Sequence, residues 1–484
     1  MKNKTIDYIL WFVFVIAITY FKFSYHELWK DEWQAWFVAK DKSLSEIFSF
    51  LYYEGHPALW YLYLKIFTLF TSWSKPEYII HVAHIISVAA GLYFLFVRFT
   101  LPTVAKVLLA FSYFIFFEYG IVNRGYFLVI LFAFWAAYLL KKENYSCAQL
   151  GVVLFLLCQT EVYGALMAIA LGIYIVMKEK NVFMAIQKKD IIGLASGLLF
   201  FIISVFPRSA GHVSKTSAKQ LGFLDKILTS FQGNLSNTYA IGSTNDTFTY
   251  GWTALGLFFS VLCLFGLFFI FKNHKALRNT FFIFLIMMIS FSILFFLGGI
   301  RQWGMGFVFF IVLLEIRGLD LKNEMFAAGI LGVFGIFNII HNIKAIREDV
   351  RLPFTNAVAA GQFIKEKIPE RVPIVAINKF EATPVVGYAG RSFFELPDGV
   401  PFSYFRWVDR IYLPNENELR LFGKFKGVGG IVVLSPKPLD AQRFPSLQLW
   451  RKWDEPNYKN ENYYLYTLAL TGVKDENRSM TPVE

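Results

Sequence analysis

The chain has 484 residues, of which 56% are hydrophobic, 19% aromatic and only 17% charged. Soluble domains have about 45–50% apolar and about 25% charged residues, so this composition excludes an ordinary soluble protein and predicts an integral membrane protein. The formal net charge of +12 comes from basic residues spread among short loops between apolar runs, which fits membrane orientation and argues against a nucleic-acid-binding face.

The first apolar run covers residues 7–23 and follows Lys2 and Lys4. A cleaved signal peptide is the alternative, but the run ends in Tyr-Phe-Lys-Phe instead of a small-residue cleavage site. We therefore expect an uncleaved helix whose N-terminus lies in the cytoplasm.

Residues 24–76 form the first external loop in this interpretation. Ser43 and Glu46 have the spacing of a capping box, Gly55 suits a helix C-cap, and Pro57 suits the first position of the next helix. The apolar segment 57–70 is too short to span a bilayer. We expect two or three short helices lying on the outer membrane surface.

Further apolar runs predict a polytopic helix bundle of about 11 spans. They cover residues 7–23, 78–97, 104–122, 126–140, 147–160, 162–177, 191–206, 252–271, 280–298, 304–316 and 325–340. The three cysteines, Cys147, Cys158 and Cys263, lie in or beside these runs without CxxC spacing, which argues against a disulfide framework or a zinc site.

The distribution of basic residues predicts the orientation. The segments placed inside carry Lys2, Lys4, Arg98, Lys106, Lys141, Lys142, Lys178, Lys180, Lys188, Lys189, Lys272, Lys275, Arg278, Arg317 and Lys322, whereas the short outer turns carry only Arg124 and Arg301. Since Lys and Arg in short loops mark the cytoplasmic side, we expect a multi-pass inner (cytoplasmic) membrane protein with its N-terminus inside and its C-terminal domain outside.

Two further segments complete the organisation. Residues 207–251 form a second long external loop, for which we expect no regular structure, and we expect it to order around a donor phosphate with Arg208 or Lys215 contributing. Solvation beside lipid headgroups is the alternative. Residues 1–344 make up the membrane module, and residues 345–484 have the composition of a small α/β domain. In that domain we predict a helix over 355–367 with Thr355 as N-cap, and strands at 372–377, 430–434 and 463–468.

The adjacent carboxylates Asp31 and Glu32 are the first candidate for chemistry. Neighbouring helical residues point about 100° apart, so one would act on a substrate while the other binds a cation or a nearby base. An ordinary solvated loop is the alternative. Trp29, Trp33 and Trp36 enclose the pair, although membrane interfaces also enrich tryptophan without catalysis.

The second candidate is the sequence Glu54-Gly-His56-Pro57. His56 is either the N-cap of the next helix or faces the same pocket as Asp31, together with Glu54. Asp31, Glu32 and His56 are the residues that would bind a divalent cation if one is used, but they are too few to establish a metal site.

The third candidate comprises the two outer arginines. Arg124 is accompanied by Glu118 and Tyr126, and Arg301 lies in Gly-Gly-Ile-Arg-Gln-Trp. Arginine is suited to bidentate phosphate binding, which favours a lipid-phosphate site, while contact with lipid headgroups is the alternative. A polar break between two spans adds Glu161, either as a turn residue or as part of the cavity.

Together these residues resemble the GT-C membrane glycosyltransferases that use polyprenyl-phosphate sugars. The similar groups are the bacterial relatives of protein O-mannosyltransferases and of lipid A aminoarabinose transferase. The resemblance rests on Asp31-Glu32 after the first span, the Glu-Gly-His-Pro sequence, the Asn123-Arg124-Gly-Tyr126 turn, the Arg301 turn and the α/β tail. The chain departs from the family where Pro57-Ala58 replaces Pro-Pro, and where Asn123 and Arg124 stand at an acidic position.

The resemblance implies transfer of a sugar from a polyprenyl-phosphate carrier to a glycan, lipid or protein acceptor on the outer side of the membrane. Asp31 would be the general base of an inverting displacement, and Arg124 and Arg301 would bind the leaving phosphate. A transporter or lipid flippase that moves an anionic substrate is the alternative, and a non-catalytic scaffold is a third hypothesis. No nucleotide cradle or nucleic-acid partner is indicated.

Overall fold

The computed structural model describes residues 4–142, 144–179, 189–205, 221–240, 252–320, 323–407, 409 and 411–470. The chain divides into two compact units. The helical unit comprises Met1–Ser24 and Ser43–Glu348, and the α/β unit comprises Tyr25–Lys42 and Asp349–Glu484. The expected division at 345 assigned all of 24–76 to the membrane module, whereas Tyr25–Lys42 pack with the C-terminal segment.

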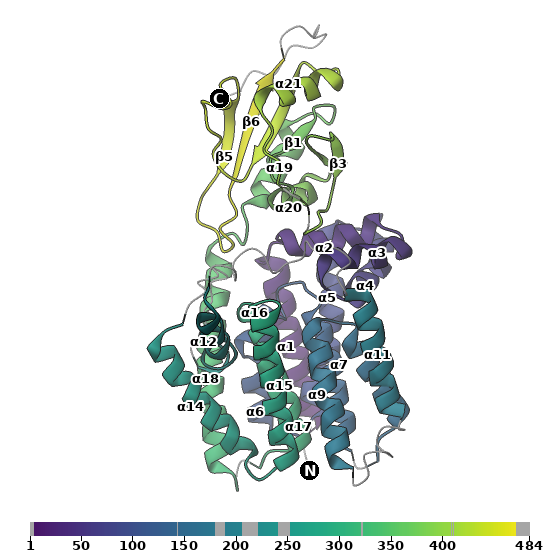
Figure 1. Ribbon diagram of the computed structural model, residues 1–484, viewed down its shortest axis with the longest axis vertical. Helices are drawn as coiled ribbons and strands as arrows, with labels where there is room; N and C mark the ends of the chain where they lie inside the picture. Colours follow the sequence, from purple (N-terminus) through teal and green to yellow (C-terminus); the bar gives the residue numbers. More distant parts are fainter. Residues whose placement is uncertain are drawn as a thin grey trace. The chain divides into compact units, whose positions relative to one another are not determined.

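The helical unit is a bundle of apolar helices, most of which run alongside one another in Figure 1. Among the described residues, five helices are long and apolar enough to cross a membrane: α1 (Lys4–Ser24), α5 (Pro76–Tyr93) with its extension to Arg98, α14 (Ala254–Phe271), α15 (Lys275–Leu294) and α18 (Met325–Arg351). The others are α6 (Thr103–Ala110), α7 (Tyr126–Leu140), α8 (Cys147–Cys158), α9 (Val162–Lys178), α11 (Lys189–Val205), α16 (Ile300–Trp303) and α17 (Met305–Arg317).

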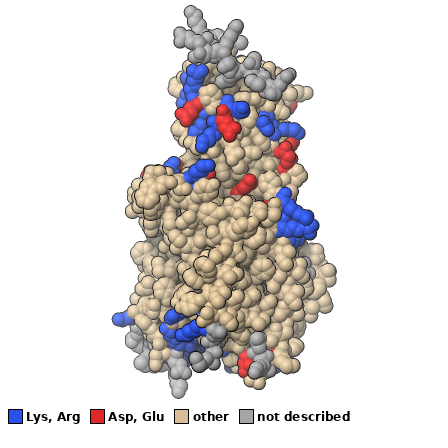
Figure 2. Space-filling view, turned by 180° about the vertical axis from the view of Figure 1, so that it is seen from behind, with Lys and Arg blue, Asp and Glu red and all other residues tan. Residues whose placement is uncertain are grey.

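The side chains of α1 show how these helices are placed. Phe14, Ile18 and Lys22 follow one another at four-residue spacing and are buried, whereas Phe12 and Ile16 are more than half exposed. This periodicity gives one stripe packed against the bundle and one apolar surface suited to lipid. On the face shown in Figure 2, the middle of the helical unit likewise presents a broad band without charged residues.

Short helices follow α1 as expected. They are α2 (Lys30–Asp41), α3 (Leu44–Glu54) and α4 (Leu59–Phe67), with a 3₁₀ turn over Thr68–Phe70. The capping box is confirmed, because the Ser43 amide donates to Glu46 Oε2 (2.8 Å) and the Glu46 amide donates to Ser43 Oγ (3.3 Å). Gly55 ends α3 with a φ of 69°, as a left-handed C-cap requires.

Two details of the predicted caps and loops are wrong. The helix after Pro57 begins at Leu59 with Ala58 as N-cap, so neither Pro57 nor His56 starts it. The second loop contains α12 (Phe223–Asn234) and α13 (Ser236–Tyr239), so it does have regular structure. Helices α12 and α13 are amphipathic or polar and too short to span a membrane. A search for apolar runs therefore does not find them. Arg208 and Lys215 lie outside the described residues.

The α/β unit contains a six-stranded sheet in the order β3-β2-β1-β4-β6-β5, in which β1 is parallel to β2 and β4 while the other pairs are antiparallel. Its elements are α19 (Ala357–Lys367), β1 (Ile374–Ala376), α20 (Lys379–Ala389), β2 (Phe393–Glu395), β3 (Val400–Phe402), α21 (Glu416–Phe425), β4 (Gly430–Ser435), β5 (Gln448–Trp453) and β6 (Tyr463–Ala469). The three predicted strands are confirmed as β1, β4 and β6. Asn356, not Thr355, occupies the N-cap of α19.

The position of α2 in this unit follows from its packing. Residues 32–39 of α2 are all buried, and the helix packs on α20. A Cβ atom on Gly387 of α20 would lie 2.3 Å from Trp33, so only glycine allows the tryptophan ring to approach this closely. Helix α2 therefore belongs to the core of the α/β unit by its contacts.

Candidate active site

Arg124 is the most distinctive of the predicted residues. It lies in the turn between a π-helical segment (Tyr113–Glu118) and α7. In the stretch 112–130, every residue of which the structure describes, Arg124 is the only one that is not buried. Its guanidinium carbon lies 5.5 Å from the centre of the Tyr126 ring. The turn is therefore tightly packed, and within it only the Arg124 side chain is partly exposed.

Arg301 is placed differently, because its side chain is buried. Its Nε lies 3.4 Å from Glu118 Oε1, and Glu118 Oε2 accepts a hydrogen bond from the Tyr113 hydroxyl (2.7 Å). A buried charge requires such a partner. The Tyr119 hydroxyl in turn donates to the Arg301 carbonyl (2.5 Å), which fixes the turn of Arg301 against the segment that precedes Arg124.

The two arginine turns adjoin each other through Tyr126. Its hydroxyl accepts a hydrogen bond from Gln302 Nε2 (3.1 Å), and the charges of Arg124, Arg301 and Glu161 all act on it. The structure therefore brings together elements that are more than 170 residues apart in the sequence.

His56 and Glu161 form a close pair beside the Arg124 turn. The two side chains approach to 2.7 Å between Nδ1 and Oε2. Burial and the charge of Arg124 lower the pKa of His56, but the attraction and hydrogen bond of Glu161, together with the charge of Glu54, raise it overall. A Cβ atom on Gly125 would lie 3.4 Å from Glu161 Oε1, so the Arg124 turn packs directly against this pair.

Glu54 belongs to the same neighbourhood. It is buried and accepts a hydrogen bond from the Tyr61 hydroxyl (3.1 Å), on which the charges of Glu54, Glu161 and Arg124 act together. The helical unit therefore gathers all the residues that the sequence predicted in it as site residues, namely Glu54, His56, Glu118, Arg124, Tyr126, Glu161 and Arg301.

Asp31 and Glu32 lie in the first turn of α2, where carboxylates favour the helix N-terminus. Glu32 is buried, accepts the Trp29 amide at Oε2 (3.0 Å) and pairs at Oε1 with His26 Nε2 (3.0 Å). Asp31 remains partly exposed. The two acids therefore face different surroundings, and Glu32 is the one bound to a nearby base.

The residues around this turn belong to the α/β unit. His26 Nδ1 lies 3.9 Å from Asp349 Oδ2, and Lys30 pairs with Glu381 (2.8 Å). The tryptophans Trp29, Trp33 and Trp36 are at most 7% exposed, so they are buried side chains and do not form an exposed interfacial belt.

The described residues contain no group of three or more His, Cys, Asp or Glu side chains suited to a metal ion. Asp31 and Glu32 lie in the α/β unit and His56 lies in the helical unit.

Several residues of these clusters were not predicted as site residues. Lys22 of α1 is completely buried and donates to Asn123 Oδ1 (2.8 Å). His26 and Gln302, which also belong to these clusters, had no sequence signal. Only Lys22, as a lysine inside the end of an apolar run, offered a hint.

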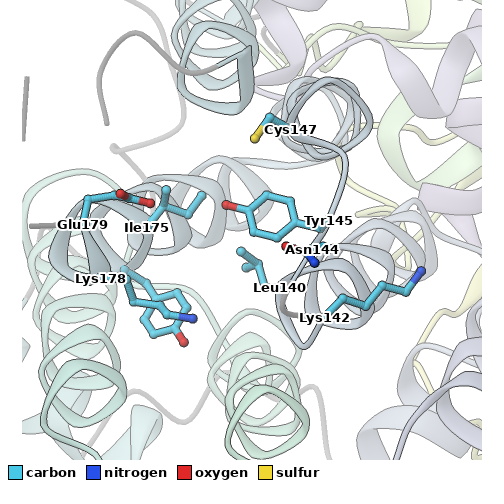
Figure 3. A pocket seen from close by; sticks show the side chains of 9 residues that line it. Leu140, Lys142, Asn144, Tyr145, Cys147, Ile175, Lys178 and Glu179 are labelled. Carbon is cyan, nitrogen blue, oxygen red and sulfur yellow. The ribbon is translucent and has the colours of Figure 1, made fainter. Parts of the chain in front are cut away.

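A pocket of about 320 Å³ lies elsewhere in the helical unit (Figure 3). It is lined by Leu140, Lys142, Asn144, Tyr145, Cys147, Tyr174, Ile175, Lys178 and Glu179. Leu140 ends α7, whereas the Arg124 turn precedes its first residue, so the pocket and the turn are separated by the length of that helix, about 22 Å. The pocket contains none of the predicted site residues.

The His26 cluster predicts a pH dependence of stability. Burial opposes protonation, but Glu32 and Asp349 raise the pKa of His26 from 6.5 to about 9. Its contribution, on the order of 3 kcal/mol, is complete below pH 6.5 and disappears as the pH rises through 9. Burial raises the pKa of Glu461 to about 7, so the titration of this residue changes the stability at a lower pH than that of His26 does.

We therefore expect the melting temperature of the detergent-solubilised protein to fall between pH 7.5 and 9.5. A His26→Gln variant should melt lower at pH 7 and lose most of this dependence, whereas His341→Gln should retain it. Equal slopes in the wild type and His26→Gln would show that the imidazolium contributes nothing.

No family model matches this sequence, and no curated protein matches it. Solved structures do match it, and two of them are described here. ArnT from Cupriavidus metallidurans in the apo state has a TM-score of 0.53 and 10% identity, with 95% of this chain and 97% of that chain covered. ArnT bound to undecaprenyl phosphate has a TM-score of 0.53 and 9% identity, with 97% and 99% covered. The likeness shows the fold, and the predicted GT-C fold is confirmed.

Proposed function

We propose that this protein is a membrane glycosyltransferase that moves a sugar from a polyprenyl-phosphate carrier to an envelope acceptor. The observation that supports this most strongly is the Arg124 turn, in which a tightly packed segment presents one guanidinium next to the His56–Glu161 and Arg301–Glu118 pairs. The GT-C fold adds support, since a protein of this fold has been solved with undecaprenyl phosphate bound.

The leaving group explains the need for a cation. As the bond between the anomeric carbon and the phosphate oxygen breaks, negative charge grows on the departing polyprenyl phosphate. A guanidinium that is already positioned stabilises this charge without further reorganisation. Arg124 is suited to the task because it is not buried, while Arg301, which already pairs with Glu118, would share its charge between that carboxylate and the phosphate.

The attacking group requires a base. We assign this role to Asp31, whose carboxylate takes the proton of the acceptor hydroxyl as its oxygen bonds to the anomeric carbon and polyprenyl phosphate departs. This single displacement inverts the anomeric centre. Glu32 supports Asp31 indirectly, because its bonds to Trp29 and His26 fix the first turn of α2.

The reaction is assigned to the extracytoplasmic side. The count of basic residues in short loops supports an N-terminus in the cytoplasm. A lipid-linked donor suits a compartment without nucleotides, and it reaches a membrane enzyme by diffusion in the bilayer. The acceptor is a glycan, a lipid or a protein of the envelope.

Membrane vesicles containing the protein and a radiolabelled polyprenyl-phosphate sugar provide the test, with envelope extract as the source of acceptor. We expect label to enter an acceptor while free polyprenyl phosphate is released in equal amount. An Arg124→Ala variant at the same abundance is the control for background enzymes. Movement of labelled lipid between leaflets without release of polyprenyl phosphate would instead identify a flippase.

A further inference from the structure

Lys22 is a lysine with no exposed side-chain surface in a predominantly apolar helix. It ends the buried stripe of α1 that begins with Phe14 and Ile18. A buried ammonium within a membrane protein is costly, so it persists where its hydrogen bonds serve a purpose.

Two of its hydrogen bonds are to the turn before Arg124. The Lys22 ammonium donates to the carbonyl of Ile121 and to Asn123 Oδ1, the latter at 2.8 Å. His81 of α5 approaches the same Oδ1 with its Nδ1 at 3.3 Å. Two helices, α1 and α5, thus fix the Asn123 side chain.

The turn itself needs such support. Residues 119–123 are buried although they form no regular helix or strand, and buried backbone groups outside such elements need partners from elsewhere. Lys22 supplies one to the Ile121 carbonyl, while the Arg124 amide donates to the Val122 carbonyl (3.0 Å). Lys22 therefore restrains the backbone immediately before the guanidinium.

We infer that Lys22 is a positioning residue that holds the Arg124 guanidinium in place for the phosphate of the lipid donor. This inference rests on the proposed function, because it assigns Lys22 a purpose through Arg124. A lysine that served folding alone would have the same contacts, so the two roles are separated by whether the effect of Lys22 depends on Arg124.

A double-mutant cycle makes this distinction. Lys22→Met should lower kcat/KM for sugar transfer about tenfold at equal amounts of folded protein, within the range of coupling energies of neighbouring residues. In an Arg124→Ala background, Lys22→Met should lower kcat/KM little further, because the guanidinium that Lys22 positions is absent.

Lys106 provides a matched control. It is also a buried lysine of the helical unit, 1% exposed, whose ammonium lies 3.1 Å from Asp7 Oδ2. Lys106→Met should lower the melting temperature while leaving kcat/KM of the folded protein unchanged, both alone and with Arg124→Ala. If Lys22→Met does not fold, Asn123→Ala removes the same link from its other end and completes the cycle.

The dissociation constant for polyprenyl phosphate, measured on the same variants, separates this inference from the proposed function. Coupling in binding without any sugar transfer by the wild type would overturn the proposed function and support Lys22 as a positioning residue. Sugar transfer with independent, additive effects of Lys22 and Arg124 would overturn the inference and leave the function standing. Unchanged kcat/KM and unchanged affinity in Lys22→Met would also overturn it.

Discussion

Replacing Asp31 with asparagine is expected to lower sugar transfer by about 10²–10⁴-fold, the usual contribution of a positioned general base. Asparagine is nearly isosteric but accepts no proton, so donor binding and protein abundance should remain close to wild type. The partly exposed position of Asp31 is consistent with this role, because a base must reach its substrate.

The same helix supplies the control. Asp41 lies at the other end of α2, is exposed and accepts a hydrogen bond from the Ser403 hydroxyl (2.5 Å). Asp41→Asn therefore changes the charge of α2 equally without removing the proposed base, and it should retain full turnover. Asp31→Asn and wild type are compared as correctly folded protein in the same vesicles. Equal initial rates would show that Asp31 is not the base.

Glu32 is expected to behave differently from its neighbour. Its carboxylate is shared between the Trp29 amide and His26, so its replacement should act on the folding of the α/β unit before it acts on chemistry. The sequence predicted that one acid would act on a substrate while the other binds a cation or a nearby base. Glu32 does lie beside His26, and the action of Asp31 on a substrate stays a prediction.

The sequence predicted most of the architecture because long apolar runs, caps and strand patterns are local signals. Ser43, Glu46 and Gly55 fulfilled their predicted roles since each depends on neighbours within four residues. The polar helix α12 was missed because burial against other helices, not its own composition, makes it regular. The packing of α2 on α20 is a long-range contact that no local pattern encodes.

For the candidate site, too, the sequence predicted what depends on local signals and missed what depends on long-range contacts. Arg124 and Arg301 were identifiable as isolated cations against the charge bias of the loops. Their different surroundings were not, because the burial of Arg301 beside Glu118 depends on segments far apart in the sequence.

Replacing Arg124 with alanine is expected to reduce kcat by about 10²–10³-fold, on the scale of about 2.7–4 kcal/mol for the loss of one donor to a developing oxyanion. The interaction strengthens as charge grows on the leaving phosphate, so kcat should fall and not only the affinity for the donor. Lysine at this position should restore part of the rate, because it returns the charge without the bidentate geometry of arginine.

Arg98 is the matched control for this experiment. Like Arg124 it lies at a helix end of the helical unit and over a tyrosine ring, with its guanidinium carbon 4.4 Å from the centre of Tyr138. Arg98→Ala should leave turnover unchanged at matched abundance.

If Arg124 only contacted lipid headgroups, lysine would replace it fully, and alanine would reduce insertion or abundance in the same way as Arg98→Ala. Full turnover in both Arg124 variants would therefore exclude the phosphate role, whereas a graded loss from arginine through lysine to alanine is the result that the packed turn predicts.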